Sequence, residues 1–211
     1  MKDVINFLLC GVGGQGTVLA SDVLVNVGLA AGLDAKQAEV HGMSQRGGSV
    51  TSHVRWGRAV HAPIVGQGEA DVLLAFEKLE ALRNLRALRP GGVALINNQA
   101  IIPLTVTSGG QKYPADEDIR AAFAALTPRA HFVDGERIAE GLGNLRVANV
   151  VLLGALSALL ERDPALEDAA LSAETWLKVI EERVPAKYVE LNRRAFEEGR
   201  RAVAITFLEY P

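Results

Sequence analysis

This chain of 211 residues contains a single cysteine, Cys10. One thiol cannot form an intrachain disulfide, and it cannot supply the set of thiolates that an iron–sulfur cluster requires. The four histidines, at positions 41, 53, 61 and 131, lack the close spacing that is typical of a zinc site. We therefore expect this chain to hold no metal of its own.

The chain also lacks an excess of positive charge, since its formal net charge is −3, and we do not expect nucleic acid as a partner. Its longest apolar stretch, residues 147–160, is shorter than the roughly 20 residues that a membrane span requires. The apolar run near the N-terminus leads into a glycine turn rather than into a signal-peptide cleavage site. These features predict a cytoplasmic protein without membrane contact.

Apolar runs typical of buried strands alternate with helical patterns, which predicts an α/β fold with a mainly parallel sheet flanked by helices. The predicted core strands are residues 4–9, 71–76, 91–98 and 130–135. The predicted helices between them are residues 19–30, 77–89 and 114–126, with Pro90-Gly91-Gly92 ending the second. The last third is predicted to be helical, over residues 144–161, 172–184 and 185–203. A single domain spanning residues 1–211 is the default at this length.

The stretch CGVGGQGTVLAS, residues 10–21, makes the start of the chain Rossmann-like. Its glycines at 11, 13 and 16 form the G-x-G-x-x-G pattern that can hold a dinucleotide pyrophosphate at a helix N-terminus. That pattern also needs an acid at the end of a second strand, for which Glu39 is the candidate. However, residues 33–40 are too polar for a central strand, and Gly14 adds an extra glycine. A nucleotide site and a purely architectural turn both remain open.

A second glycine-rich cluster, EVHGMSQRGGSV, occupies residues 39–50. Arg46 is followed there by two glycines, which let the backbone come close to a ligand. The Arg46 guanidinium can then bind a carboxylate or phosphate through two hydrogen bonds. A tight loop whose arginine pairs with a local acceptor fits equally well. Residues 49–57 then alternate in polarity, which predicts a strand with one polar face that is exposed or meets a partner.

Three single residues have plain structural interpretations. Cys10 ends the first strand, where a small buried hydrophobe is expected. His53 is expected to be a surface residue rather than a general base. Gly154 interrupts an apolar helix and indicates close packing against a neighbouring helix.

The two clusters together resemble the gamma-type subunit of 2-oxoacid:ferredoxin oxidoreductases. The resemblance runs from near residue 5 to about residue 200, over the segments GVGGQGTVLASDVL, AEVHGMSQRGGSVTSHVRWG, NVVLLGAL and NRRAFEEG. G-x-G-G-Q-G followed by Q-R-G-G-S is its specific part, whereas the C-terminal segments only support it. Within the family, EVHGMSQRGGSV is most similar to the beta subunit of indolepyruvate ferredoxin oxidoreductases.

The resemblance implies a multisubunit enzyme that converts a 2-oxoacid, coenzyme A and oxidised ferredoxin into an acyl-CoA, CO2 and reduced ferredoxin. For the indolepyruvate branch, the substrates are arylpyruvates formed from aromatic amino acids. Thiamine diphosphate and 4Fe–4S clusters are implied in a large partner subunit, so this chain would bind no cofactor and would be inactive alone. Ferredoxin and coenzyme A are implied as partners of the whole complex.

The resemblance also assigns a role to the first cluster and implies no catalytic residue in this chain. It makes the glycine turn an architectural and interface element, formed by Gly11, Gly13, Gly14, Gln15 and Gly16. The chemistry of the second cluster, a cation beside two glycines facing anionic substrates, predicts that it faces the partner's active site, coenzyme A or substrate. Its candidate residues are His41, Ser44, Gln45, Arg46, Gly47, Gly48 and Ser49. Two alternatives remain: the same role toward pyruvate, 2-oxoglutarate or a branched-chain 2-oxoacid, and a free-standing nucleotide-binding Rossmann-like protein.

Overall fold

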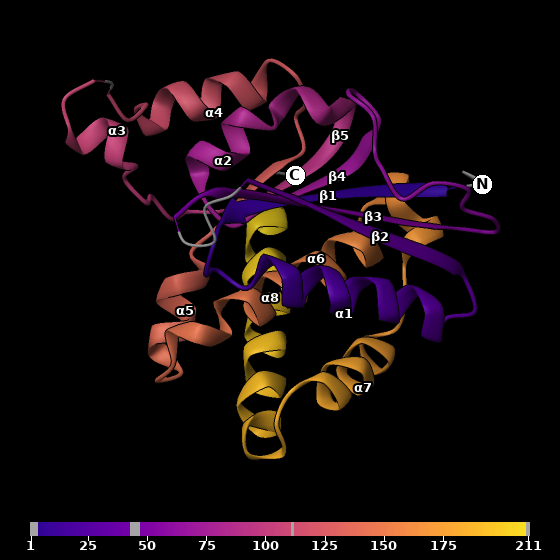
Figure 1. Ribbon diagram of the computed structural model, residues 1–211. Coiled ribbons are helices and arrows are strands. Elements are labelled where there is room, and N and C mark those ends of the chain that lie inside the picture. Colours follow the sequence, from indigo (N-terminus) through magenta and orange to yellow (C-terminus); the bar gives the residue numbers. More distant parts are fainter. Residues whose placement is uncertain (1–3, 43–46, 111, 210–211) are drawn as a thin grey trace.

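A six-stranded sheet in the order β2-β3-β1-β4-β5-β6 separates two layers of helices (Figure 1). The computed structural model describes residues 4–42, 47–110 and 112–209. The strands are β1 (Val4–Val12), β2 (Asp34–His41), β3 (Ser49–Gly57), β4 (Ala70–Ala75), β5 (Leu88–Asn97) and β6 (Ala130–Val133). β1, β4, β5 and β6 pair in parallel, whereas β3 runs antiparallel to both of its neighbours. The predicted α/β fold with a mainly parallel sheet is confirmed.

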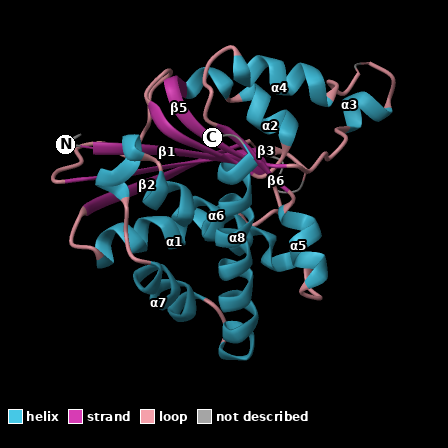
Figure 2. Ribbon diagram, turned by 180° about the vertical axis from the view of Figure 1, so that it is seen from behind, coloured by secondary structure: helices cyan, strands magenta, loops and turns pink. Residues whose placement is uncertain are grey.

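The helices cover both faces of this sheet (Figure 2). One layer consists of α1 (Thr17–Ala30), α5 (Gly135–Gly141), α6 (Ala148–Arg162), α7 (Ala173–Arg183) and α8 (Val189–Glu209). The other layer consists of α2 (Lys78–Arg83), α3 (Leu104–Thr107) and α4 (Asp116–Ala124). Short 3-10 turns lie at Leu85–Ala87, Leu145–Val147, Pro164–Ala169 and Ala186–Tyr188. The last third of the described chain is helical, as predicted.

Each face of the sheet has its own hydrophobic core, because successive strand residues point to opposite faces. In β1, Phe7 and Leu9 enter the larger core beneath α1, α6 and α8, whereas Leu8 and Cys10 enter the smaller core beneath α2 and α4. The larger core also contains Trp56, whose ring centroid lies 4.6 Å from that of Phe7. A strand buried on both faces is apolar throughout, which is why β1 is evident from the sequence.

The crossing of α6 and α8 brings two backbones into direct contact. A Cβ on Gly154 would lie 2.0 Å from the carbonyl oxygen of Phe196. A Cβ on Gly199 would lie 1.9 Å from the carbonyl oxygen of Val151. Both distances are far below van der Waals contact, so the helices can approach this closely only with glycine at both positions. The prediction that Gly154 marks close helix packing is confirmed.

The predicted helix over residues 77–89 is wrong in its extent. α2 ends at Arg83, and β5 begins at Leu88, which is buried and pairs with Ala70 of β4. Pro90-Gly91-Gly92 therefore lies inside β5 instead of ending a helix, where the register with β4 shifts. Gly91 has a φ of 67°, which suits a glycine at such a bulge.

The polar residues 34–41 form β2 at the edge of the sheet, which confirms that they are not a central strand. β3 lies between β2 and β1 and buries Ser52, Val54 and Trp56. Its opposite, polar face is partly covered by the chain itself: Arg55 donates to the Asn6 side-chain oxygen at 2.8 Å. On the side of β1 away from β4, the neighbouring strand is thus the antiparallel β3. A Rossmann fold has its parallel second strand at this position.

His53, on that polar face, is half-buried and holds a neighbouring loop. The backbone N–H of Val65 donates to its Nδ1 at 3.1 Å. Burial lowers the pKa of His53 below its ordinary value of 6.5. Protonation would also remove the lone pair that accepts the Val65 bond, so folding favours the neutral ring.

The stability contributed by neutral His53 is present above the unfolded pKa and is lost as the pH falls through the lower folded pKa. We expect the Tm to fall between about pH 7 and about pH 5. In His53→Gln the fall should be smaller but not absent, because burial also lowers the pKa of His131. Thermal unfolding of the wild type and of His53→Gln across this range measures the pH dependence of the Tm. Equal dependence in the two proteins would contradict the role of His53.

Candidate functional site

The glycine turn connects β1 to α1 at the carboxyl edge of the sheet. Gly16 caps the N-terminus of α1 with a φ of 80°, a left-handed conformation that favours glycine. A Cβ on Gly16 would also lie 2.6 Å from the side-chain nitrogen of Asn149, in the first turn of α6. Both backbone conformation and the close approach of α6 therefore require glycine at this position.

Gln15 links the ends of β1 and β4 by hydrogen bonds. Its Oε1 accepts from the Val12 N–H at 2.7 Å, and its Nε2 donates to the Phe76 carbonyl at 2.9 Å. A Cβ on Gly11 would lie 2.9 Å from that Oε1, so the first glycine makes room for the Gln15 amide. In open α/β sheets, ligands bind in the crevice beyond the strand ends. The Gln15 bonds at this place support an architectural role for the turn.

A chain of side-chain hydrogen bonds continues along the carboxyl edge from Gln15. Gln15 Nε2 donates to Gln99 Oε1 at 2.7 Å, and Gln99 in turn donates to Glu136. Asn97, at the end of β5, donates to the Phe76 carbonyl at 3.1 Å and accepts from the Gly135 N–H at 3.0 Å. These bonds join residues at or just beyond the ends of all four parallel strands. We call Gln15, Asn97, Gln99 and Glu136 the amide chain.

Sequence reasoning missed three members of the amide chain: Asn97, Gln99 and Glu136. The available signal was their position, because each lies at or directly after the end of a predicted core strand. Carboxyl ends of parallel strands meet at one edge of a sheet, so polar residues there are expected to lie close together.

The second glycine cluster lies against the first where the structure describes it. The Gly13 N–H donates to the Gly48 carbonyl at 2.8 Å, and the Gly47 N–H donates to the Gly13 carbonyl at 3.5 Å. The Ser49 hydroxyl donates to Glu80 Oε2 at 2.6 Å, which ties the end of the cluster to α2. Ser44, Gln45 and Arg46 lie outside the described residues.

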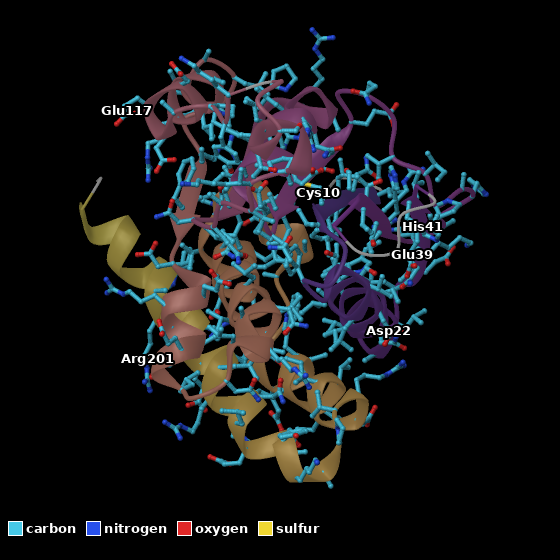
Figure 3. All side chains as sticks on the ribbon, turned by 60° about the vertical axis from the view of Figure 1, so that its left-hand side comes forward. Cys10, Asp22, Glu39, His41, Glu117 and Arg201 are labelled. Atoms are coloured by element: carbon cyan, nitrogen blue, oxygen red, sulfur yellow. The ribbon has the colours of Figure 1, made fainter. Side chains whose placement is uncertain are left out.

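Two cavities flank the glycine turn. One, of about 420 Å3, is lined by the turn, the start of α1 and the exposed residues Glu39 and His41. Both of these residues lie at the carboxyl end of β2, near one another (Figure 3). The other cavity, of about 610 Å3, is lined by the turn, members of the amide chain and Leu145. The carboxyl edge therefore offers recessed surface, more apolar than polar, on both sides of the turn.

Cys10 is not available as a ligand or nucleophile. It is fully buried, and its thiol donates to the Glu80 carbonyl at 3.5 Å. Burial raises the pKa of Cys10 well above its ordinary value, so the sulfur stays protonated. Over the described part of the chain, His, Cys, Asp and Glu side chains form no group of three that could hold a metal ion. In the same residues, no helix has both the length and the apolar character of a membrane span.

Comparison with known proteins places both glycine clusters inside one family pattern. Residues 6–202 match the family described as pyruvate ferredoxin/flavodoxin oxidoreductase. This chain belongs to that family. Its likeness to "Indolepyruvate oxidoreductase subunit IorB" of Thermococcus kodakarensis is 40% identity over 205 residues, covering 93% of this chain and 95% of the relative. The corresponding subunit of Archaeoglobus fulgidus is 37% identical over 195 residues, covering 92% and 93%.

The fold agrees with this family assignment. The gamma subunit of the keto/oxoacid ferredoxin oxidoreductase from Geobacter sulfurreducens superposes with a TM-score of 0.69 at 26% identity. The superposition covers 95% of this chain and 99% of that subunit. The resemblance that the sequence motifs carry is thus confirmed by sequence relatives and by fold, over nearly the whole chain.

Proposed function

We propose that this chain is the small, cofactor-free subunit of an indolepyruvate:ferredoxin oxidoreductase. The complex would convert an arylpyruvate, coenzyme A and oxidised ferredoxin into an arylacetyl-CoA, CO2 and reduced ferredoxin. The observation that carries the proposal is the 40% identity, over 93% of this chain, to a relative named as an indolepyruvate oxidoreductase subunit. The second candidate is the same role toward pyruvate, 2-oxoglutarate or a branched-chain 2-oxoacid, and it is favoured by the family description, which names pyruvate.

In this proposal, thiamine diphosphate and the 4Fe–4S clusters belong to a larger partner subunit. The buried, protonated state of Cys10 supports this division, because a cluster needs several accessible thiolates. This chain then contributes no reacting group. Its part is to shape the surface that meets the larger subunit, with the glycine turn at that interface.

The carboxyl edge is the part of this chain that we assign to the partner's active site. Contact between Gly13 and Gly48 supports this, because it brings the N-terminus of α1 beside the described end of the second cluster. Arylpyruvates and coenzyme A are both anions, and a helix N-terminus attracts negative charge. Arg46, in the same segment, is the residue proposed to add a cation.

Co-expression tests the assignment. We expect the chain to co-elute with the larger subunit as one complex that reduces ferredoxin with arylpyruvates at least about tenfold more efficiently, in kcat/KM, than with pyruvate. The isolated chain is expected to be colourless and inactive. An iron–sulfur spectrum from the chain alone would refute the division of cofactors, and a preference for pyruvate would support the second candidate.

Arg46→Ala tests the proposed anion contact. Loss of a charge-assisted hydrogen bond is worth about 1.5–3 kcal/mol, so the KM for coenzyme A or the 2-oxoacid should rise about tenfold or more in the assembled complex. The matched control is Arg58→Ala, an exposed arginine beyond the opposite end of β3. Failed assembly would make Arg46 an interface residue, and unchanged kinetics in an intact complex would defeat both roles.

A further inference from the structure

Between β5 and α4 the chain leaves the sheet and makes an excursion that includes α3. We call residues 101–110 the arm. In Figures 1 and 2 it lies at the periphery, with α3 standing away from the sheet. Its sequence, IIPLTVTSGG, contains no charged residue, although 22% of the chain is charged. The arm is therefore an uncharged projection on an otherwise charged protein surface.

One buried carboxylate holds the chain at both ends of the arm. Glu77 is 1% exposed, and its Oε1 accepts from the Ile101 N–H at 3.0 Å and from the Tyr113 hydroxyl. Its Oε2 accepts from the Glu80 N–H at 2.9 Å, which caps α2. Close by, Lys78 pairs with Asp116 at 2.6 Å. The base of the arm is thus fixed to α2.

The Tyr113 hydroxyl stays protonated at physiological pH. Burial, with a smaller contribution from the hydrogen bond to Glu77, raises the pKa of Tyr113 far above its ordinary value of 10. The hydroxyl therefore remains a donor for the bond to Glu77.

The rigid base presents apolar surface to water. Ile102 is 58% exposed, more than any other large hydrophobic side chain that the structure describes as exposed. Four such side chains lie at the carboxyl edge: Val18, Val40, Ile102 and Leu145. Ile101 and Leu145 also line the 610 Å3 cavity beside the glycine turn, so the arm is continuous with the candidate site. Apolar surface gathered around one edge is typical of a protein interface.

We propose that the arm docks into an apolar pocket of the larger partner subunit, with Ile102 as its anchor and Glu77 as the positioning residue. The inference rests on the proposed function, which supplies the partner. The absence of charge on the arm matches an apolar receiving surface rather than an acidic or basic one. The fixed base supports docking because a preordered segment loses less conformational entropy on binding.

Ile102→Asp in the full chain tests the anchor. We expect its Kd for the purified larger subunit to rise at least about tenfold, since a charge placed in an apolar pocket is costly. The matched control is Ile64→Asp, which is 49% exposed and lies between β3 and β4 at the opposite edge of the sheet. Its Kd should stay within about twofold of wild type. Wild-type affinity in Ile102→Asp would overturn the proposal, and so would equal losses in both variants.

Tyr113→Phe tests the positioning role without changing the apolar surface. We expect amide hydrogen exchange in residues 101–110 to accelerate, the Tm to stay nearly constant, and the Kd to rise several-fold. Faster exchange with unchanged affinity would overturn the role of Glu77.

Two further outcomes separate this inference from the proposed function. If the wild-type chain fails to bind the larger subunit, the proposed function fails and takes this inference with it. If the chain alone forms a dimer that Ile102→Asp dissociates, sedimentation will reveal it, and the occupant is then a second copy instead of the larger subunit.

Discussion

Gly199→Ala is expected to destabilise the fold by about 3 kcal/mol or more, even though alanine is the better helix former. The gain in helix propensity is only about 1 kcal/mol. The opposing effect is a steric clash, because the new Cβ would lie 1.9 Å from the backbone oxygen of Val151. A backbone atom in a helix cannot rotate away as a side chain can, so α6 and α8 must separate. Separation opens the larger core along both helices, and Gly154→Ala should cost a similar amount for the same reason.

Urea unfolding measures this effect, and Gly141→Ala is its control. Gly141 is also helical, at the end of α5, and an added Cβ there meets no atom within 4 Å. The control should therefore be neutral or stabilising by up to about 1 kcal/mol. If Gly199→Ala and Gly141→Ala unfold at the same urea concentration, the tight crossing does not determine the stability of this fold.

Gly16→Ala is expected to destabilise the fold by about 2–3 kcal/mol through two separable effects. An alanine in the left-handed conformation at a φ of 80° costs about 1–2 kcal/mol. The remainder comes from displacing the buried side chain of Asn149, whose nitrogen would lie 2.6 Å from the new Cβ. Because the turn lies in the candidate site, affinity for the larger subunit should fall as well.

A double-mutant cycle with Asn149→Ala separates these two effects. In that background the steric conflict is gone, so Gly16→Ala should cost only the backbone term of about 1–2 kcal/mol. Equal costs in both backgrounds would mean that α6 and the turn are not sterically coupled.

The strands that the sequence predicts well are those buried on both faces. β1, β4 and the second half of β5 follow from short apolar runs, because a central parallel strand has no polar face. β6 was also predicted, although it is an edge strand in which only Val133 is buried. The extent of α2 could not be predicted. Residues 77–89 have a helical pattern, but pairing between Leu88 and Ala70 draws the end of that stretch into the sheet. That pairing depends on tertiary structure, so the helix propensity of residues 77–89 cannot predict it.

The candidate site also has features that local sequence predicts and features that depend on long-range contacts. The glycines of the turn were recognisable because their requirement is local: a sharp turn and the start of a helix. The role of Gln15 was not recognisable, because its partners Phe76 and Gln99 lie 61 and 84 positions away in the sequence. The Glu77 bonds to Ile101 and Tyr113 were missed for the same reason. The antiparallel insertion of β3 beside β1 also depends on long-range pairing, which alternation in polarity alone does not specify.

The amide chain gives the carboxyl edge a mechanical property. Gln15 is bonded to Gln99, and Gln99 to Glu136, so the ends of the outer and inner parallel strands are linked without a gap. Among these four described strand ends, none can move away from its neighbours without breaking one of the bonds. A partner that contacts these strand ends therefore meets groups that are fixed relative to one another. We expect its association rate to be limited by orientation on encounter, with little rearrangement of this edge after contact.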